Sequence, residues 1–200
     1  MNIQEAGWKI LSLRKEEISF TFPLFFIYLF SGIFFATGQV YTESLFLQSY
    51  GAAGLSKFFT INGIVLFLSG FIYTYILELF SLKRAYIILI ILFCCIPGST
   101  ILPFNWLPHD PLYLFIGNYI ATFYLDAHFI NFSFQFLTLQ SSKRIFPILM
   151  AGSKLGGIFI TILISLYNAP FIKYAAFIWL LTGLCILIPF FTLPKIKYTK

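Results

Sequence analysis

The stretch FTFPLFFIYLFSGIFFATGQV, residues 20–40, contains no charged side chain and is apolar on nearly every face of a helix. A helix needs about 20 mainly apolar residues to cross the hydrocarbon core of a bilayer, which is about 30 Å thick. The stretch therefore predicts a membrane-spanning helix, and it indicates that the protein folds in a lipid bilayer.

The composition of the whole chain supports the same conclusion. Of its 200 residues, 60% are hydrophobic and only 10% are charged, whereas a soluble globular domain carries roughly 25% charged residues. The net charge of +6 can indicate a nucleic-acid partner, but the Lys and Arg residues fall in short clusters between apolar runs and form no continuous basic face. We therefore expect a lipid bilayer, and no nucleic acid, as the partner of this surface.

Six stretches are long and apolar enough to cross the bilayer, which predicts an all-α membrane protein with a six-transmembrane-helix bundle over residues 19–200. Gly51 and Gly54 are expected to end the first span, Pro97 to kink the third, and Pro147 and Pro170 to bound the fifth. Residues 1–18 are expected to form a cytoplasmic leader that is either amphipathic or unstructured. The spans are expected at about 20–49, 55–80, 85–102, 112–139, 148–167 and 175–193.

The orientation follows from the basic residues in the connections between spans. If six spans are counted, ten Lys and Arg residues fall on one side and two on the other, and such a bias marks the cytoplasmic side. We therefore expect a multi-pass protein of the cell (inner or plasma) membrane with both termini in the cytoplasm. The two sides are Lys9, Arg14, Lys15, Lys83, Arg84, Lys143, Arg144, Lys195, Lys197 and Lys200 against Lys57 and Lys173.

Three charged residues lie deep within the expected spans, namely Glu43, Asp126 and Lys154. A charge at this depth costs at least about 2.5–3.5 kcal/mol on the insertion scale, so it usually faces protein or water. Asp126 and Lys154 differ in depth by about 7 Å at 1.5 Å per residue, which a Lys side chain can cover. Three alternatives remain: an ion pair that locks two helices, a role in substrate or proton coupling, or no direct contact.

The expected fourth span carries two polar stripes. At 100° per residue, Asp126 lies opposite Tyr124, His128, Asn131, Gln135 and Thr138, and it shares its own face with Thr122 and Ser133. One stripe is expected to face a cavity and the other a neighbouring helix. On the first span Gln39 and Glu43 are four residues apart and share a face. His128 either takes part in proton coupling or, more commonly for a lone histidine, hydrogen-bonds across helices.

Small residues indicate where helices approach closely. Gly152, Gly156 and Gly157 form a small-xxx-small pattern in the expected fifth span, and Gly63 and Gly70 of the second span are interpreted in the same way, as packing glycines.

Recognisable catalytic motifs are absent from the sequence. It has no Gly-x-Ser-x-Gly elbow, no His-Glu-x-x-His zinc helix, no phosphate-binding glycine loop and no Asp-rich metal cluster. Its three cysteines lie in apolar runs without a neighbouring His or Cys that completes a metal site. We expect no enzymatic activity, no cofactor and no bound metal.

Four segments give the chain a family resemblance: YTESLFLQSYG (41–51), the following residues 55–75, the basic turn SLKRAY (81–86) and SSKRIFPILMAGSKLGG (141–157). With these, the chain resembles the amino-terminal half of a major facilitator superfamily transporter, and within it the ATP/ADP translocase-like (nucleotide transporter) branch. The resemblance implies a central cavity bordered by the first, second, fourth and fifth helices, with the third and sixth outside. It also implies that substrate binds between two halves.

The leading hypothesis is therefore half of a secondary transporter that works by alternating access on a nucleotide or another small metabolite. It implies a second six-helix half or a homo-oligomer as partner. The alternatives are a non-transporting scaffold that assembles through its glycine faces and a small intramembrane enzyme acting on lipid. The expected substrate-binding residues are Gln39, Glu43, Tyr124, Asp126, His128, Asn131, Gln135 and Lys154.

Overall fold

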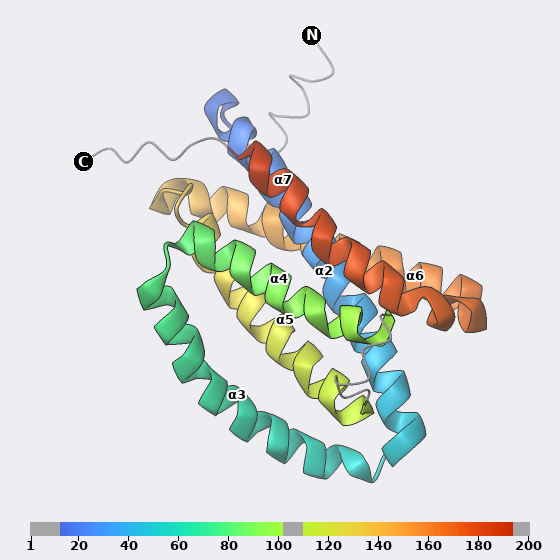
Figure 1. Ribbon diagram of the computed structural model, residues 1–200. Coiled ribbons are helices and arrows are strands. Elements are labelled where there is room, and N and C mark those ends of the chain that lie inside the picture. Colours follow the sequence, from blue (N-terminus) through green and yellow to red (C-terminus); the bar gives the residue numbers. More distant parts are fainter. Residues whose placement is uncertain (1–12, 102–109, 194–200) are drawn as a thin grey trace.

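The computed structural model describes residues 13–101 and 110–193, and every regular element in these ranges is a helix. The long helices lie against one another as a bundle, while α3 bows away from it along one side (Figure 1). The helices are α2 (Lys15–Tyr50), α3 (Gly54–Leu79), α4 (Leu82–Ile101), α5 (Pro111–Ser133), α6 (Leu139–Cys185) and α7 (Leu187–Thr192).

The first helix is longer than the stretch that predicts it. It begins at Lys15, inside the range expected for the leader, and the Glu17 carboxylate accepts a 2.8 Å hydrogen bond from the backbone N–H of Arg14. Acidic side chains in the first turn also stabilise a helix, because they interact favourably with the positive end of its dipole. The helix ends as expected at Gly51, whose φ of 64° suits glycine, whereas Gly54 opens α3. The rest of the expected leader, residues 1–12, lies outside the described residues.

Two expected boundaries, the end of the fourth span at 139 and the start of the fifth at 148, are wrong. Helix α5 ends at Ser133 and α6 already begins at Leu139. Thr138 caps the start of α6, because its hydroxyl accepts a hydrogen bond from the Ser141 N–H. This bond satisfies one of the backbone N–H groups that have no partner in the first turn of a helix, so α6 can begin at Leu139, eight residues before Pro147. Pro147 therefore lies inside the helix, as Pro97 lies inside α4, and prolines are tolerated in membrane helices in this way.

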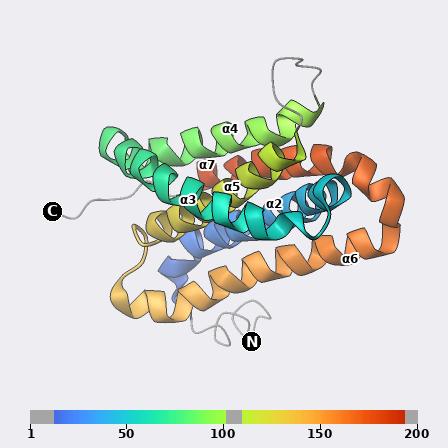
Figure 2. The ribbon, with the colours of Figure 1, turned by 90° about the horizontal axis from the view of Figure 1, so that it is seen from below.

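Helix α6 is continuous over 47 residues, yet its ribbon turns back on itself and leads into α7 (Figure 2). It thus forms two arms. The first arm contains the apolar segment Leu139–Leu166. The second arm begins the apolar segment Tyr174–Thr192, which continues into α7. Pro170 lies within α6 between these two segments and does not end the helix.

Glycines bring the first arm of α6 against α2. A Cβ atom on Gly32 would overlap the backbone carbonyl of Ser153, and a Cβ atom on Gly156 would overlap that of Leu29. The small-xxx-small prediction for Gly156 is thus confirmed, because only glycine lets the two backbones approach this closely. Gly63, in contrast, has no neighbour among the described residues that an added Cβ would meet, so no contact within this part of the chain supports the packing interpretation of Gly63.

The second arm of α6 and α7 pack on α4 and α2. The Tyr86 ring stacks on Phe190 with centroids 4.5 Å apart, and the fully buried Trp179 lies 5.8 Å from Phe34 between ring centroids. These aromatic contacts form the main core of the protein.

Five segments of the described chain are long and apolar enough to cross a membrane: Glu16–Tyr50, Gly54–Leu79, Leu82–Ile101, Leu139–Leu166 and Tyr174–Thr192. The count of clearly apolar spans is therefore five and not six. Helix α5 has 23 residues, which is long enough, but its polar residues, among them Asn118, Asp126 and His128, make it less apolar than the others. The chain is a polytopic, all-α membrane protein.

Candidate functional site

A cavity of about 430 Å³ lies among α2, α5 and the first arm of α6. Its polar lining comes from all three helices and includes one carboxylate and one ammonium group. Apolar side chains such as Phe35, Met150 and Ile158 complete the wall. The polar residues are Gln39 on α2, Thr122 and Asp126 on α5, and Ser153, Lys154 and Thr161 on α6.

Asp126 and Lys154 line this cavity without touching one another. The two side chains form no ion pair within 4.0 Å and no hydrogen bond to another residue in the described ranges. Lys154 is near enough for its charge to act on the Asp126 carboxylate, but the Lys154 side chain is exposed and Asp126 is half-buried. The alternative of an ion pair that locks α5 to α6 is therefore not realised.

Gln39 is held at the cavity by its neighbour on the next turn of α2. Its Nε2 atom donates a 2.9 Å hydrogen bond to Oε1 of Glu43, which confirms that the two share a face. The Tyr119 hydroxyl on α5 lies 3.4 Å from the same Glu43 oxygen and donates to it. Glu43 is not among the residues that line the cavity. It contacts Gln39 on one side and Tyr119 on the other, and so lies between α2 and α5.

A second cavity, of about 370 Å³, lies between α3 and α5. Thr122 and Asp126 line it as well, together with Leu66 of α3 and Tyr119 of α5. The Asp126 carboxylate thus stands between two adjoining cavities. Together these cavities are bordered by α2, α3, α5 and the first arm of α6, whereas α4 and the second arm border neither.

The other polar stripe of α5 faces neighbouring helices, as the helical spacing predicts. The Tyr124 hydroxyl donates a 2.8 Å hydrogen bond to the Leu66 carbonyl and lies 2.8 Å from the Ser69 hydroxyl. His128 is fully buried, with Nε2 3.0 Å from the Leu82 carbonyl and Nδ1 3.2 Å from the Tyr73 hydroxyl. Because a carbonyl only accepts, Nε2 is the donor and Nδ1 accepts from Tyr73. Both residues fasten α5 to α3 and to the start of α4.

The remaining expected substrate-binding residues lie apart from the cavity. Asn131 is exposed on the last turn of α5, near Tyr73. Gln135 follows the end of α5, where its backbone N–H bonds to the Phe132 carbonyl, and Thr138 caps α6. The stripe expected to continue to Thr138 therefore stops with the helix. Of the eight expected residues, Gln39, Asp126 and Lys154 meet at one cavity.

Sequence reasoning placed Thr122 on the Asp126 face but missed Ser153 and Thr161, the hydroxyl groups of α6 that complete the cavity lining. Thr122 precedes Asp126 by four residues and Thr161 follows Lys154 by seven, so each shares a helix face with a charged residue. These residues can be found in the sequence by looking for hydroxyl groups at helical spacing from Asp126 and Lys154.

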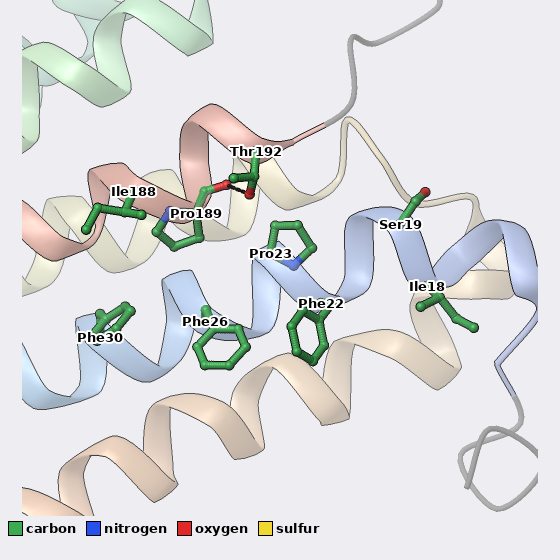
Figure 3. A pocket seen from close by; sticks show the side chains of 9 residues that line it. All are labelled: Ile18, Ser19, Phe22, Pro23, Phe26, Phe30, Ile188, Pro189 and Thr192. Carbon is green, nitrogen blue, oxygen red and sulfur yellow. Dashed lines mark hydrogen bonds between the residues drawn. The ribbon is translucent and has the colours of Figure 1, made fainter. Parts of the chain in front are cut away.

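A larger groove, of about 600 Å³, lies between the first half of α2 and α7. Figure 3 shows its lining, including Phe22, Phe26 and Phe30 along α2 and Ile188 and Pro189 across from them. The Thr192 hydroxyl is bonded to the Pro189 carbonyl at 2.7 Å (Figure 3), and Ser19 is the other polar lining residue. The described lining residues carry no charge, so this groove suits lipid chains better than a polar solute.

The described residues hold no group of three or more His, Cys, Asp or Glu side chains placed to bind a metal ion. Comparisons with family models, with curated proteins and with solved structures find no match to this chain.

Proposed function

We propose that this protein is half of a secondary solute transporter and that the cavity among α2, α5 and α6 is its solute site. The observation that carries the proposal is the placement of Asp126 and Lys154. Each charge is costly in a membrane, and yet the two line an open polar cavity instead of neutralising each other. Charges retained in this way are typical of substrate and ion pathways.

The arrangement of helices supports the same proposal. The two adjoining cavities are bordered by α2, α3, α5 and the first arm of α6, which are the first, second, fourth and fifth helices that the major facilitator resemblance implies. The polar helix α5 would then be the sixth crossing, and the alternation of basic connections would place both termini in the cytoplasm of a cell-membrane protein.

A second half is part of the proposal because the cavity side of the molecule is open. Only 6% of the most apolar stretch of α3 is buried, and Lys154 is exposed. A carrier of this kind closes its cavity with a second bundle of six helices, whether a separate chain or a second copy.

The scaffold alternative loses part of its support, although no described residue lies near Gly63. It relied on glycine faces that are free to assemble with another protein, but Gly32 and Gly156 are already occupied by the crossing of α2 and α6 within the chain.

Uptake into proteoliposomes tests the proposal. The full chain, alone and with any six-helix chain that copurifies with it, is reconstituted and offered radiolabelled amino acids, nucleotides and sugars. We expect uptake of one class above that of empty vesicles, and loss of this uptake in Asp126→Asn and Lys154→Gln. Lys57→Gln is the control, because Lys57 is an exposed lysine of α3 that lines neither cavity. No uptake in either preparation contradicts a transport function.

A further inference from the structure

The charges around the cavity restrict the kind of solute that it can hold. Asp126 supplies one negative charge and Lys154 one positive charge, and the other polar lining groups are neutral amides and hydroxyls. Neither charged group has a hydrogen-bonding or ion-pair partner among the residues that the structure describes. Both are therefore available to a solute.

A solute with a single charge would satisfy only one of these groups. The other would remain in a membrane cavity without a partner, which is unfavourable when water is excluded. A solute with several negative charges, such as a nucleotide, would meet one ammonium group and would also be repelled by Asp126. A solute that carries one positive and one negative charge satisfies both groups at once.

We infer that the cavity binds a small zwitterionic solute of the amino-acid type, with its cationic group at Asp126 and its anionic group at Lys154. This inference rests on the proposed function and specifies the substrate class of the same site. The volume of about 430 Å³ lies within the usual range for small-molecule sites. Because the two charges are more than 4.0 Å apart, the solute bridges them with its two ends, while Gln39 and the hydroxyls of Thr122 and Ser153 offer neutral hydrogen bonds between.

Thermal unfolding and calorimetry of the full chain in lipid nanodiscs test the inference. The probes are glycine, 4-aminobutyrate and 6-aminohexanoate, which carry the same two charges at increasing separation. Butylamine and butyrate, alone and mixed, are the single-charge references at equal ionic strength. We expect at least one zwitterion to raise the unfolding temperature and to bind more tightly than either reference. The zwitterion that binds most tightly should be the one whose charge separation matches the distance between Asp126 and Lys154.

The variants connect this binding to the two charges. Loss of a hydrogen bond to a charged group is worth about 1.5–3 kcal/mol, or roughly a ten- to hundredfold loss of affinity, and we expect this loss in both Asp126→Asn and Lys154→Gln. Lys154 is exposed, so its variant is expected to fold. Lys57→Gln should bind like the unchanged protein. Exchange of the two residues, Asp126→Lys with Lys154→Asp, should bind zwitterions better than either single variant.

The possible outcomes are distinguishable. Equal stabilisation by butylamine, butyrate and the zwitterions, or binding that is unchanged in both single variants, overturns the inference. If no zwitterion binds but another solute is taken up in a manner that requires Asp126, the substrate class is wrong and the transporter function stands. If a zwitterion binds through both charges but is not taken up, the site stands and the transport function fails.

Discussion

The carboxylate of Glu17 accepts a 2.7 Å hydrogen bond from Nη2 of Arg144, a residue 127 positions further along the chain. The other oxygen of Glu17 caps the start of α2 through the Arg14 N–H. One carboxylate thus joins the beginnings of α2 and α6, and it is buried to a greater degree than its partner, with exposed fractions of 10% and 32%.

We expect Glu17→Gln to lower the free energy of unfolding by about 1–3 kcal/mol, because a charge-assisted hydrogen bond is weakened. A double-mutant cycle with Arg144→Gln, followed by thermal unfolding in detergent, measures the coupling. Glu16→Gln is the matched control, because the neighbouring Glu16 side chain is exposed. Equal effects of the two Glu substitutions would show that the ion pair does not join the helices.

The crossing of α2 and α6 should be sensitive to a single methyl group. Gly32→Ala and Gly156→Ala each place a Cβ on a backbone carbonyl, and overpacking of this kind costs about 1–3 kcal/mol. Gly63→Ala should be neutral or stabilising, because no described residue lies within 4 Å of a Cβ atom added there and alanine has the higher helix propensity. Denaturant unfolding of the three variants measures the difference, and a similar loss in all three would contradict the close crossing.

Two buried tyrosines should respond in opposite directions to loss of their hydroxyl group. The Tyr86 hydroxyl has no hydrogen-bond partner among the described residues, and an unsatisfied buried polar group costs about 1–3 kcal/mol, so Tyr86→Phe should raise the unfolding temperature. Tyr124→Phe should lower it, because the Leu66 carbonyl and the Ser69 hydroxyl lose their hydrogen bond to α5 and keep only the one between themselves. A decrease in both variants would indicate that Tyr86 has a partner after all.

The attachment of α3 should depend on His128. Little of α3 is buried, and the hydrogen bond from the Tyr73 hydroxyl to His128 is one of a few polar contacts that hold it to α5. We expect Tyr73→Phe to increase amide hydrogen exchange in α3, with little change in α2. The control is Tyr75→Phe, because the Tyr75 side chain is exposed on the same helix. Equal exchange in both variants would show that α3 is held by other contacts.

The sequence alone determined that the chain is a membrane protein built from helices, because runs of about 20 apolar residues have no other stable arrangement in lipid. It also determined local features, such as the turn at Gly51 and the shared face of Gln39 and Glu43, which depend only on neighbours a few residues away. The separation of the Asp126 and His128 faces of α5 follows from helical periodicity in the same way.

Only the tertiary structure decided which faces meet. Glu17 reaches Arg144, Tyr73 reaches His128, and Asp126 and Lys154 stay apart across a cavity, although depth along the helices had allowed Asp126 and Lys154 to pair. Periodicity gives the relative angle of residues on one helix, but the rotation and crossing of two helices depend on packing such as that of Gly32 against Ser153. The separation of Asp126 and Lys154 across the cavity is therefore a property of how α5 and α6 are placed in the bundle, and not of either helix alone.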